Sequence, residues 1–188
     1  MVKLEDCIND FWRYLENNSI EIYNEFSLQH ELGIYLRCNL PDYNVQFERN
    51  VKYFYNSCNT TKHEIDIVIF KPDFSGKYAI ELKYPRNGQH PEQMYAFIKD
   101  IVFMEELKNL GFDETYTMTV VEDPKFYSGD YSNSNIYRFF RGNKTITGEI
   151  QKPTGTKTIN DKVSVKGQYI VNWINSYNNL KYYFIKIK

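Results

Sequence analysis

The stretch that decides the fold is residues 63–84, His-Glu-Ile-Asp-Ile-Val-Ile-Phe-Lys-Pro-Asp-Phe-Ser-Gly-Lys-Tyr-Ala-Ile-Glu-Leu-Lys-Tyr. In its first half, Ile65, Ile67 and Ile69 occupy alternate positions, which is the period-two pattern of a β-strand. A turn follows at residues 72–76, where proline fixes one φ angle and glycine supplies another. The second half alternates again, so the stretch predicts a β-hairpin.

This hairpin would gather ionisable side chains on one face. Glu81 and Lys83 alternate with Ile80 and Leu82 in the second strand, and the pairing brings Asp66 beside them. Two carboxylates and an amine suit a hard divalent cation and the water that it activates. The alternative is an amphipathic strand whose outward residues include Glu81 and Lys83, with Asp66 as a cross-strand partner of Lys83.

The segments on either side of the hairpin predict a mixed sheet with helices packed against it. Apolar residues at three- and four-residue spacing predict helices over residues 4–17 and about 20–40, the second capped by Ser19. A strand is expected at 44–55, a helix from Pro91 to Lys108, and a strand at 114–122. Three strands, a helical crossover and a fourth strand make an α/β (α+β) fold.

The last third of the sequence is expected to be rich in β-strands. Residues 123–135 form a polar loop, and β-like runs cover 136–140, 145–152, 162–170 and 182–188, with a short helix at Trp173 to Tyr177. We expect a single domain over 1–188, with a core at about 20–122 and a C-terminal extension at about 136–188. Whether that extension is a separate subdomain or part of the sheet stays open.

Composition limits the compartment and the partners. The chain has 188 residues and three cysteines without a Cys-x-x-Cys pair, which favours a reducing environment. No apolar run approaches the roughly 20 residues of a membrane span, and the first residues do not resemble a signal peptide. We therefore expect a cytoplasmic protein with no membrane partner.

Charge is distributed unevenly although the net charge is only −1. Residues 1–137 hold 13 Lys and Arg against 22 Asp and Glu, whereas residues 138–188 hold 10 against 2. A basic region beside an acidic body indicates a polyanionic partner such as DNA, or simply a solvated surface. The basic residues that we expect near DNA are Lys52, Arg86, Arg138, Arg141, Lys144, Lys152, Lys157, Lys162 and Lys166. The interleaved aromatics Tyr137, Phe139 and Phe140 are expected to pack in the core rather than stack on bases.

The spacing of the hairpin residues resembles that of the PD-(D/E)XK nuclease superfamily, the restriction-endonuclease-like fold. Asp66 is followed, after residues 67–80, by Glu81-Leu82-Lys83. The predicted order α-βββ-α-β is similar to the core of that superfamily, and Glu31 matches a glutamate on its first core helix. The resemblance covers about residues 20–122. One departure is Ile65, where many members have proline before the aspartate.

The resemblance implies a Mg²⁺-dependent DNA nuclease, restriction-type or associated with mobile elements, in which Mn²⁺ could replace Mg²⁺. Asp66, Glu81, the Leu82 carbonyl and Glu31 would hold the metal, and Lys83 would orient or help deprotonate the attacking water. Gln93, early in the following helix, would flank the site, although an ordinary exposed residue is the simpler interpretation.

Two other functions stay open: a nucleic-acid-binding protein that lacks catalysis, and a protein-interaction module that uses the aromatic surface. The sequence does not reveal whether the DNA would be double-stranded, single-stranded or branched. A homodimer would suit cleavage of both strands of a duplex.

Overall fold

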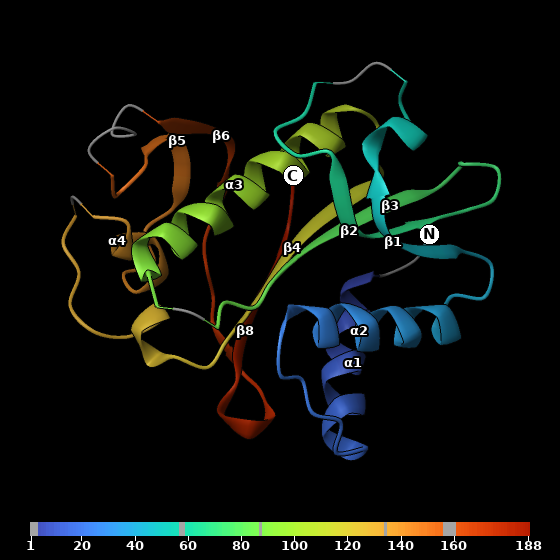
Figure 1. Ribbon diagram of the computed structural model, residues 1–188, viewed down its shortest axis with the longest axis horizontal. Helices are drawn as coiled ribbons and strands as arrows, with labels where there is room; N and C mark the ends of the chain where they lie inside the picture. Colours follow the sequence, from blue (N-terminus) through green and yellow to red (C-terminus); the bar gives the residue numbers. More distant parts are fainter. Residues whose placement is uncertain (1–3, 57–58, 87, 134, 156–160) are drawn as a thin grey trace.

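The hairpin of residues 63–84 lies in the middle of the sheet in the computed structural model, which describes residues 4–56, 59–86, 88–133, 135–155 and 161–188 (Figure 1). Strands β2 (Glu64–Phe70) and β3 (Lys77–Lys83) pair antiparallel, with Ile67 opposite Ile80. The predicted hairpin is therefore confirmed.

The turn of this hairpin differs from the expectation in one detail. The left-handed residue is Phe74, with φ +59°, and not Gly76. Asp73 Oδ1 accepts a hydrogen bond from the Ser75 backbone N–H at 2.9 Å, and the Phe74 ring stacks on that of Phe70 with centroids 5.4 Å apart. These two contacts hold Phe74 in a conformation that phenylalanine rarely adopts.

The main sheet has six strands in the order β1-β2-β3-β4-β8-β7. Strand β1 (Asn44–Asn50) pairs antiparallel with β2, and β4 (Glu114–Val121) pairs parallel with β3 through the crossover helix α3 (His90–Asn109). Strands β8 (Lys181–Lys186) and β7 (Ile174–Asn175) add antiparallel neighbours beyond β4. The sheet is thus mixed and mostly antiparallel, which fits the α+β form of the predicted class.

Helices cover both faces of the sheet (Figure 1). Helices α1 (Leu4–Asn17) and α2 (Glu25–Asn39) pack on one face, where Ile67, Ile80 and Met118 are buried. Helix α3 packs on the other face against Val68 and Ala79. Alternate residues of each strand therefore belong to two different cores.

Two predicted boundaries are wrong. Helix α2 begins at Glu25 rather than near residue 20, because Asn24 and Ser27 form a capping box in which Asn24 Oδ1 accepts from the Ser27 backbone N–H at 2.7 Å. Strand β1 ends at Asn50 rather than residue 55, because the Asn50 side chain accepts from the Lys52 N–H and starts a 3₁₀ turn, η1 (Val51–Tyr53).

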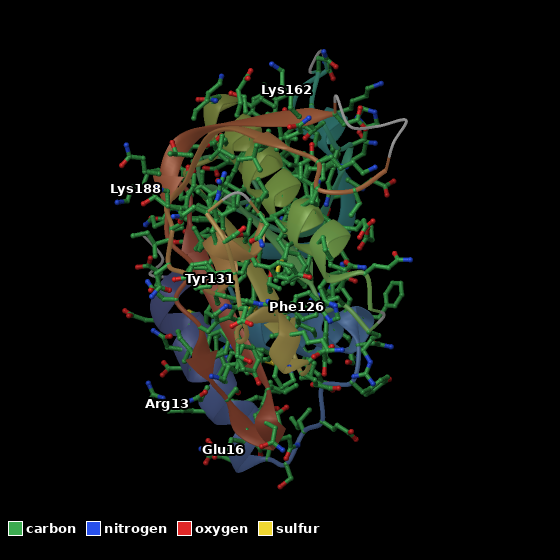
Figure 2. The ribbon with its side chains drawn as sticks, turned by 90° about the vertical axis from the view of Figure 1, so that its left-hand side faces the viewer. Arg13, Glu16, Phe126, Tyr131, Lys162 and Lys188 are labelled. Atoms are coloured by element: carbon green, nitrogen blue, oxygen red, sulfur yellow. The ribbon has the colours of Figure 1, made fainter. Side chains whose placement is uncertain are left out.

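The C-terminal region combines both arrangements that the sequence left open. Strands β5 (Ile146–Gln151) and β6 (Lys162–Tyr169) form a separate two-stranded sheet beside α3, whereas β7 and β8 extend the main sheet. In Figure 2, Lys162 of β6 lies at one end of the molecule, and Arg13 and Glu16 of α1 lie at the opposite end. The basic β5–β6 sheet is therefore far from the first helix.

Two short elements of this region were predicted incorrectly. Residues 137–140 form a helical turn, α4 (Tyr137–Phe140), instead of a strand, because Phe139 and Phe140 both turn into the core. This burial confirms the packing interpretation of these two rings. The segment from Trp173 to Tyr177 is not a helix, since Ile174 pairs with Tyr182 of β8, and a 3₁₀ turn, η3 (Tyr177–Asn179), follows.

A further 3₁₀ turn, η2 (Pro124–Phe126), lies within the predicted loop 123–135. Within the described ranges, no helix is both long and apolar enough to cross a membrane.

Candidate functional site

Strand pairing brings the predicted hairpin residues together. Because Ile67 lies opposite Ile80, the antiparallel register continues to place Asp66 opposite Glu81. Asp66 Oδ2 accepts a hydrogen bond from the Leu82 N–H at 2.7 Å, and Lys83 Nζ lies 4.0 Å from Glu81 Oε1. All three side chains belong to the face of the sheet that α3 covers.

Two residues outside the predicted set, Lys62 and Asp100, complete this group. The ammonium of Lys62, in the loop before β2, donates hydrogen bonds to both Glu81 Oε1 and Asp100 Oδ1. Asp100 comes from α3 and is 2% exposed, as is Glu81. A signal for Asp100 exists in the sequence: it falls between Phe97 and Met104 in the apolar stripe of α3, where a carboxylate is costly without a partner.

The segment that carries Lys62 is fastened to α3. The Thr61 N–H donates to Glu106 Oε2 at 2.7 Å, and its hydroxyl donates to the same oxygen at 3.0 Å. The buried Thr60 hydroxyl donates to the Lys62 carbonyl. The backbone at Lys62 is therefore fixed, whereas its four-carbon side chain retains its own rotamers.

The helix glutamate that reaches this group is Glu25, not Glu31. Glu25 Oε1 accepts from Lys83 Nζ at 3.3 Å, and Glu25 Oε2 accepts from the Tyr84 N–H at 3.0 Å. Glu31 lies six residues later, which is about 9 Å farther along the helix axis. It lines a surface hollow of about 400 Å³ together with Glu21, Tyr23 and Phe47.

The resulting group has more acids than bases and contains unpaired oxygens. We call it the Glu81 cluster: Glu25, Lys62, Asp66, Glu81, Lys83 and Asp100. Glu81 Oε2 and Asp100 Oδ2 are buried and have no hydrogen-bond partner. Buried carboxylate oxygens are normally paired, because an unpaired one loses the water that would solvate it.

Burial and mutual repulsion perturb the acids. Burial raises the pKa of Asp66 to about 6, although Lys83 and the Leu82 N–H oppose the shift. Burial, with the nearby charges of Asp100 and Asp66, raises the pKa of Glu81 well above its usual value. A group whose charged form is this costly indicates a site that lacks positive charge.

The two lysines stay protonated. Burial by itself would lower the pKa of each ammonium, but the surrounding carboxylates outweigh it, Asp100 most strongly, and both pKa values are raised. Lys62 and Lys83 therefore keep their positive charge at neutral pH.

The residues present fit a small divalent cation in part. Asp66, Glu81 and the Leu82 carbonyl are hard oxygen ligands, and the unpaired Glu81 Oε2 has capacity for one more interaction. However, the Leu82 carbonyl already accepts from Lys83 Nζ at 2.8 Å. Over the part of the chain that the structure describes, no group of three or more His, Cys, Asp and Glu side chains could hold a metal. A metal here would thus rely on one or two carboxylates and water, which is the usual coordination of Mg²⁺.

The two predicted DNA-contacting residues near the cluster, Arg86 and Gln93, differ in exposure and in pairing. Arg86 forms an exposed ion pair with Glu122, with Nη1 2.6 Å from Oε1. Gln93 lies in the first turn of α3 and is half-buried. A hollow of about 590 Å³ between α3 and β6 is lined by Lys99, Lys152 and Lys162 among other residues, and not by the cluster.

The predicted arginines of the C-terminal region support the loop beside them. Arg141 donates to the Asp130 carbonyl at 2.7 Å and stacks over the Tyr137 ring at 3.7 Å. Arg138 donates to the Asn133 carbonyl and lies over the Phe139 ring. Lys144 is exposed, as are Lys52, Lys162 and Lys166, whereas Lys157 lies outside the described residues.

No protein-family model, curated protein or solved structure matches the chain.

Proposed function

We propose that the chain is a Mg²⁺-dependent DNA nuclease that hydrolyses phosphodiester bonds at the Glu81 cluster. The observation that carries this proposal is the meeting of Asp66, Glu81 and Lys83 on adjacent strands, with a buried Glu81 oxygen that has no partner. A divalent cation bound by the carboxylates would supply an activated water and neutralise charge on the phosphate.

The contacts of Asp66 and Lys83 support a separate role for each in this reaction. Asp66 is oriented by the Leu82 N–H, so one of its oxygens is fixed and the other is directed away from that bond. Lys83 is held between the Leu82 carbonyl and Glu25, and its raised pKa keeps it protonated. A protonated lysine stabilises negative charge that develops on the phosphate, and it orients a water better than it removes a proton.

Binding of DNA would depend on exposed cations rather than on the two arginines that hold the loop. Lys52, Lys144, Lys162 and Lys166 are exposed, and Lys152 is half-buried beside the hollow of about 590 Å³. Contacts from such residues to phosphates give affinity that falls with salt concentration and carries no base sequence. A restriction-type or mobile-element enzyme would need further base contacts.

One observation favours a second candidate, a nucleic-acid-binding protein without catalysis. The Lys62 ammonium is bonded to Glu81 and Asp100, where a bound metal would otherwise interact. If that arrangement were permanent, the cluster would be a buried ion-pair network of structural type.

The test is incubation of the purified protein with supercoiled plasmid in Mg²⁺, in Mn²⁺ or in EDTA, beside Lys83→Ala. We expect nicked or linear DNA with either metal, none in EDTA, and at least about a 100-fold lower rate for Lys83→Ala. Lys77→Ala is the matched control, because Lys77 is in the same strand but its ammonium lies over the Tyr55 ring, at the far end from the cluster. Cleavage at the normal rate by Lys83→Ala would refute the assignment. Salt-dependent DNA binding without cleavage of duplex, single-stranded or branched DNA would favour the second candidate.

A further inference from the structure

The pair Glu81 and Asp100 has the features of a cation position that is already filled by a cation of the chain itself. One oxygen of each carboxylate contacts the same nitrogen, Lys62 Nζ. The other oxygen of each is buried and has no partner. Two carboxylates from different elements, β3 and α3, thus converge on a single positive charge and leave half of their lone pairs unused.

The cluster has more negative than positive charge, so it can accept further positive charge. When all groups are ionised, Glu25, Asp66, Glu81 and Asp100 face only Lys62 and Lys83. An excess of negative charge in a site with two fully buried acids is unfavourable, and a compact divalent ion would offset it better than one ammonium.

Lys62 could leave this position without disturbing the core. Its side chain is 29% exposed, whereas those of Glu81 and Asp100 are 2% and 3% exposed. The ammonium therefore reaches the carboxylates from the solvent side. Since Thr60 and Thr61 fix the backbone, a change of side-chain rotamer is sufficient to move the charge into water.

We propose that Asp100 is, with Glu81, a ligand of a divalent cation, and that Lys62 is a tethered cation that occupies this position until the ion displaces its ammonium. This inference deepens the proposed nuclease function and depends on the same site. It assigns a metal ligand on α3 and a competition between an ion and a lysine. Such a competition lowers the apparent affinity for the ion by the fraction of molecules in which the position is free.

The first experiment measures Mn²⁺ binding by calorimetry on the full chain without DNA, so that no cleavage is needed. Lys62→Met should bind Mn²⁺ roughly tenfold more tightly than the unchanged protein, and Asp100→Asn should bind it roughly tenfold more weakly. Lys99→Met is the matched control, because Lys99 is an exposed neighbour of Asp100 on α3 and lines the separate hollow beside β6. Equal or weaker binding by Lys62→Met would overturn the competition, and unchanged binding by Asp100→Asn would overturn the new ligand.

A second experiment does not depend on any variant, since Lys62→Met removes the cation nearest to two buried acids and could unfold. The unchanged protein is treated briefly with acetic anhydride, with and without saturating Mn²⁺, and acetylation of each lysine is measured by mass spectrometry. Acetylation of Lys62 should rise several-fold with Mn²⁺, because its amine moves into water, whereas that of Lys77 should not change. An unchanged or reduced value for Lys62 would overturn the proposal.

These two experiments, compared with the plasmid cleavage assay, separate this inference from the proposed function. Mn²⁺ binding that frees Lys62 without any DNA cleavage would keep the cation position and refute the nuclease. DNA cleavage with no change in the acetylation of Lys62 would keep the nuclease and refute the displacement.

Discussion

Helix α3 carries two buried carboxylates, Asp100 and Glu105, whose surroundings differ sharply. Glu105 faces β6, where the backbone N–H groups of Lys166 and Gly167 and the hydroxyl of Tyr169 all donate to it at 2.7–3.1 Å. Asp100 faces the main sheet, where one oxygen accepts from Lys62 and the other is buried without a hydrogen-bond partner. One helix therefore presents a fully paired acid to one side and a half-paired acid to the other.

The difference separates a structural role from a functional one. A carboxylate whose two oxygens are both bonded to fixed donors stabilises the packing of an element, here β6 on α3. A carboxylate with a buried oxygen that lacks a hydrogen-bond partner lowers the stability of the fold. Such groups are found at functional sites, where the free oxygen can bind a ligand. We therefore expect substitutions at the two places to have opposite consequences for stability and for activity.

The largest expected effect is on activity, at Glu81. Glu81→Gln should lower the rate of plasmid cleavage roughly 1,000-fold, because a neutral amide is a poor ligand for a hard cation. Burial and the charges of Asp100 and Asp66 already raise the pKa of Glu81 and make its ionised form costly in the folded protein. The free energy of unfolding in urea should therefore change by less than about 1 kcal/mol or increase. If Glu81→Gln lost both folding and cleavage, Glu81 would have a structural role like that of Glu105, and the predicted difference between the two acids would be wrong.

The second effect is on stability, at Glu105. Glu105→Gln places an NH₂ group among N–H donors, so at least one bond is lost, and we expect the free energy of unfolding in urea to fall by about 3 kcal/mol. Plasmid cleavage at a temperature where the variant is still folded should remain near normal. A variant that is stable but inactive would show that Glu105 belongs to the functional side of α3.

A smaller effect is expected where α2 begins, since this end of the helix carries Glu25. Asn24→Ala removes the hydrogen bond to the Ser27 N–H and should lower the free energy of unfolding by about 1 kcal/mol. Asn24→Asp keeps the acceptor and is the control. If Glu25 positions Lys83, the alanine variant should also cleave DNA more slowly than the aspartate variant; equal rates would mean that the Glu25 contact is dispensable.

The smallest effects concern two threonines of β4 on the α3 side. The Thr115 hydroxyl donates to the Met104 carbonyl at 2.8 Å, whereas the buried Thr117 hydroxyl, in register with Glu81, has no partner. Thr115→Val should lower the free energy of unfolding by about 0.5–1 kcal/mol, and Thr117→Val should raise it by a similar amount. Thermal unfolding of the two variants, compared with the unchanged protein, gives the sign of each change in stability. A loss of stability in both would mean that Thr117 has a bond partner in solution.

The hairpin and the element order could be predicted because they depend on local periodicity. Alternation in residues 63–84 fixed both strands, and with them the proximity of Asp66 to Glu81. The start of α2 was harder, because residues before the Asn24 cap continue an apolar pattern without being helical. Both Glu25 and Glu31 lie in the helix predicted at about 20–40, and Glu31 was chosen for its match to the superfamily, whereas the structure brings Glu25 to Lys83.

The rest of the cluster depends on contacts between residues far apart in the sequence. Lys62 lies in a polar loop, and no pattern in that loop shows that its ammonium reaches α3. Asp100 carried a signal, a carboxylate within an apolar stripe, but its meaning depends on which part of the sheet the helix crosses. The helical turn at 137–140 was mistaken for a strand because aromatic residues suit both.

The position of β8 has a consequence for synthesis of the chain. β8 pairs with β4 in the interior of the sheet, yet it leaves the ribosome only after α4 and the whole β5–β6 sheet. Until then, β4 presents an unpaired edge whose buried residues include Met118 and Val120. Nascent chains should therefore pass through a stage in which this edge can pair with another copy, and slower translation beyond residue 121 would lengthen that exposure.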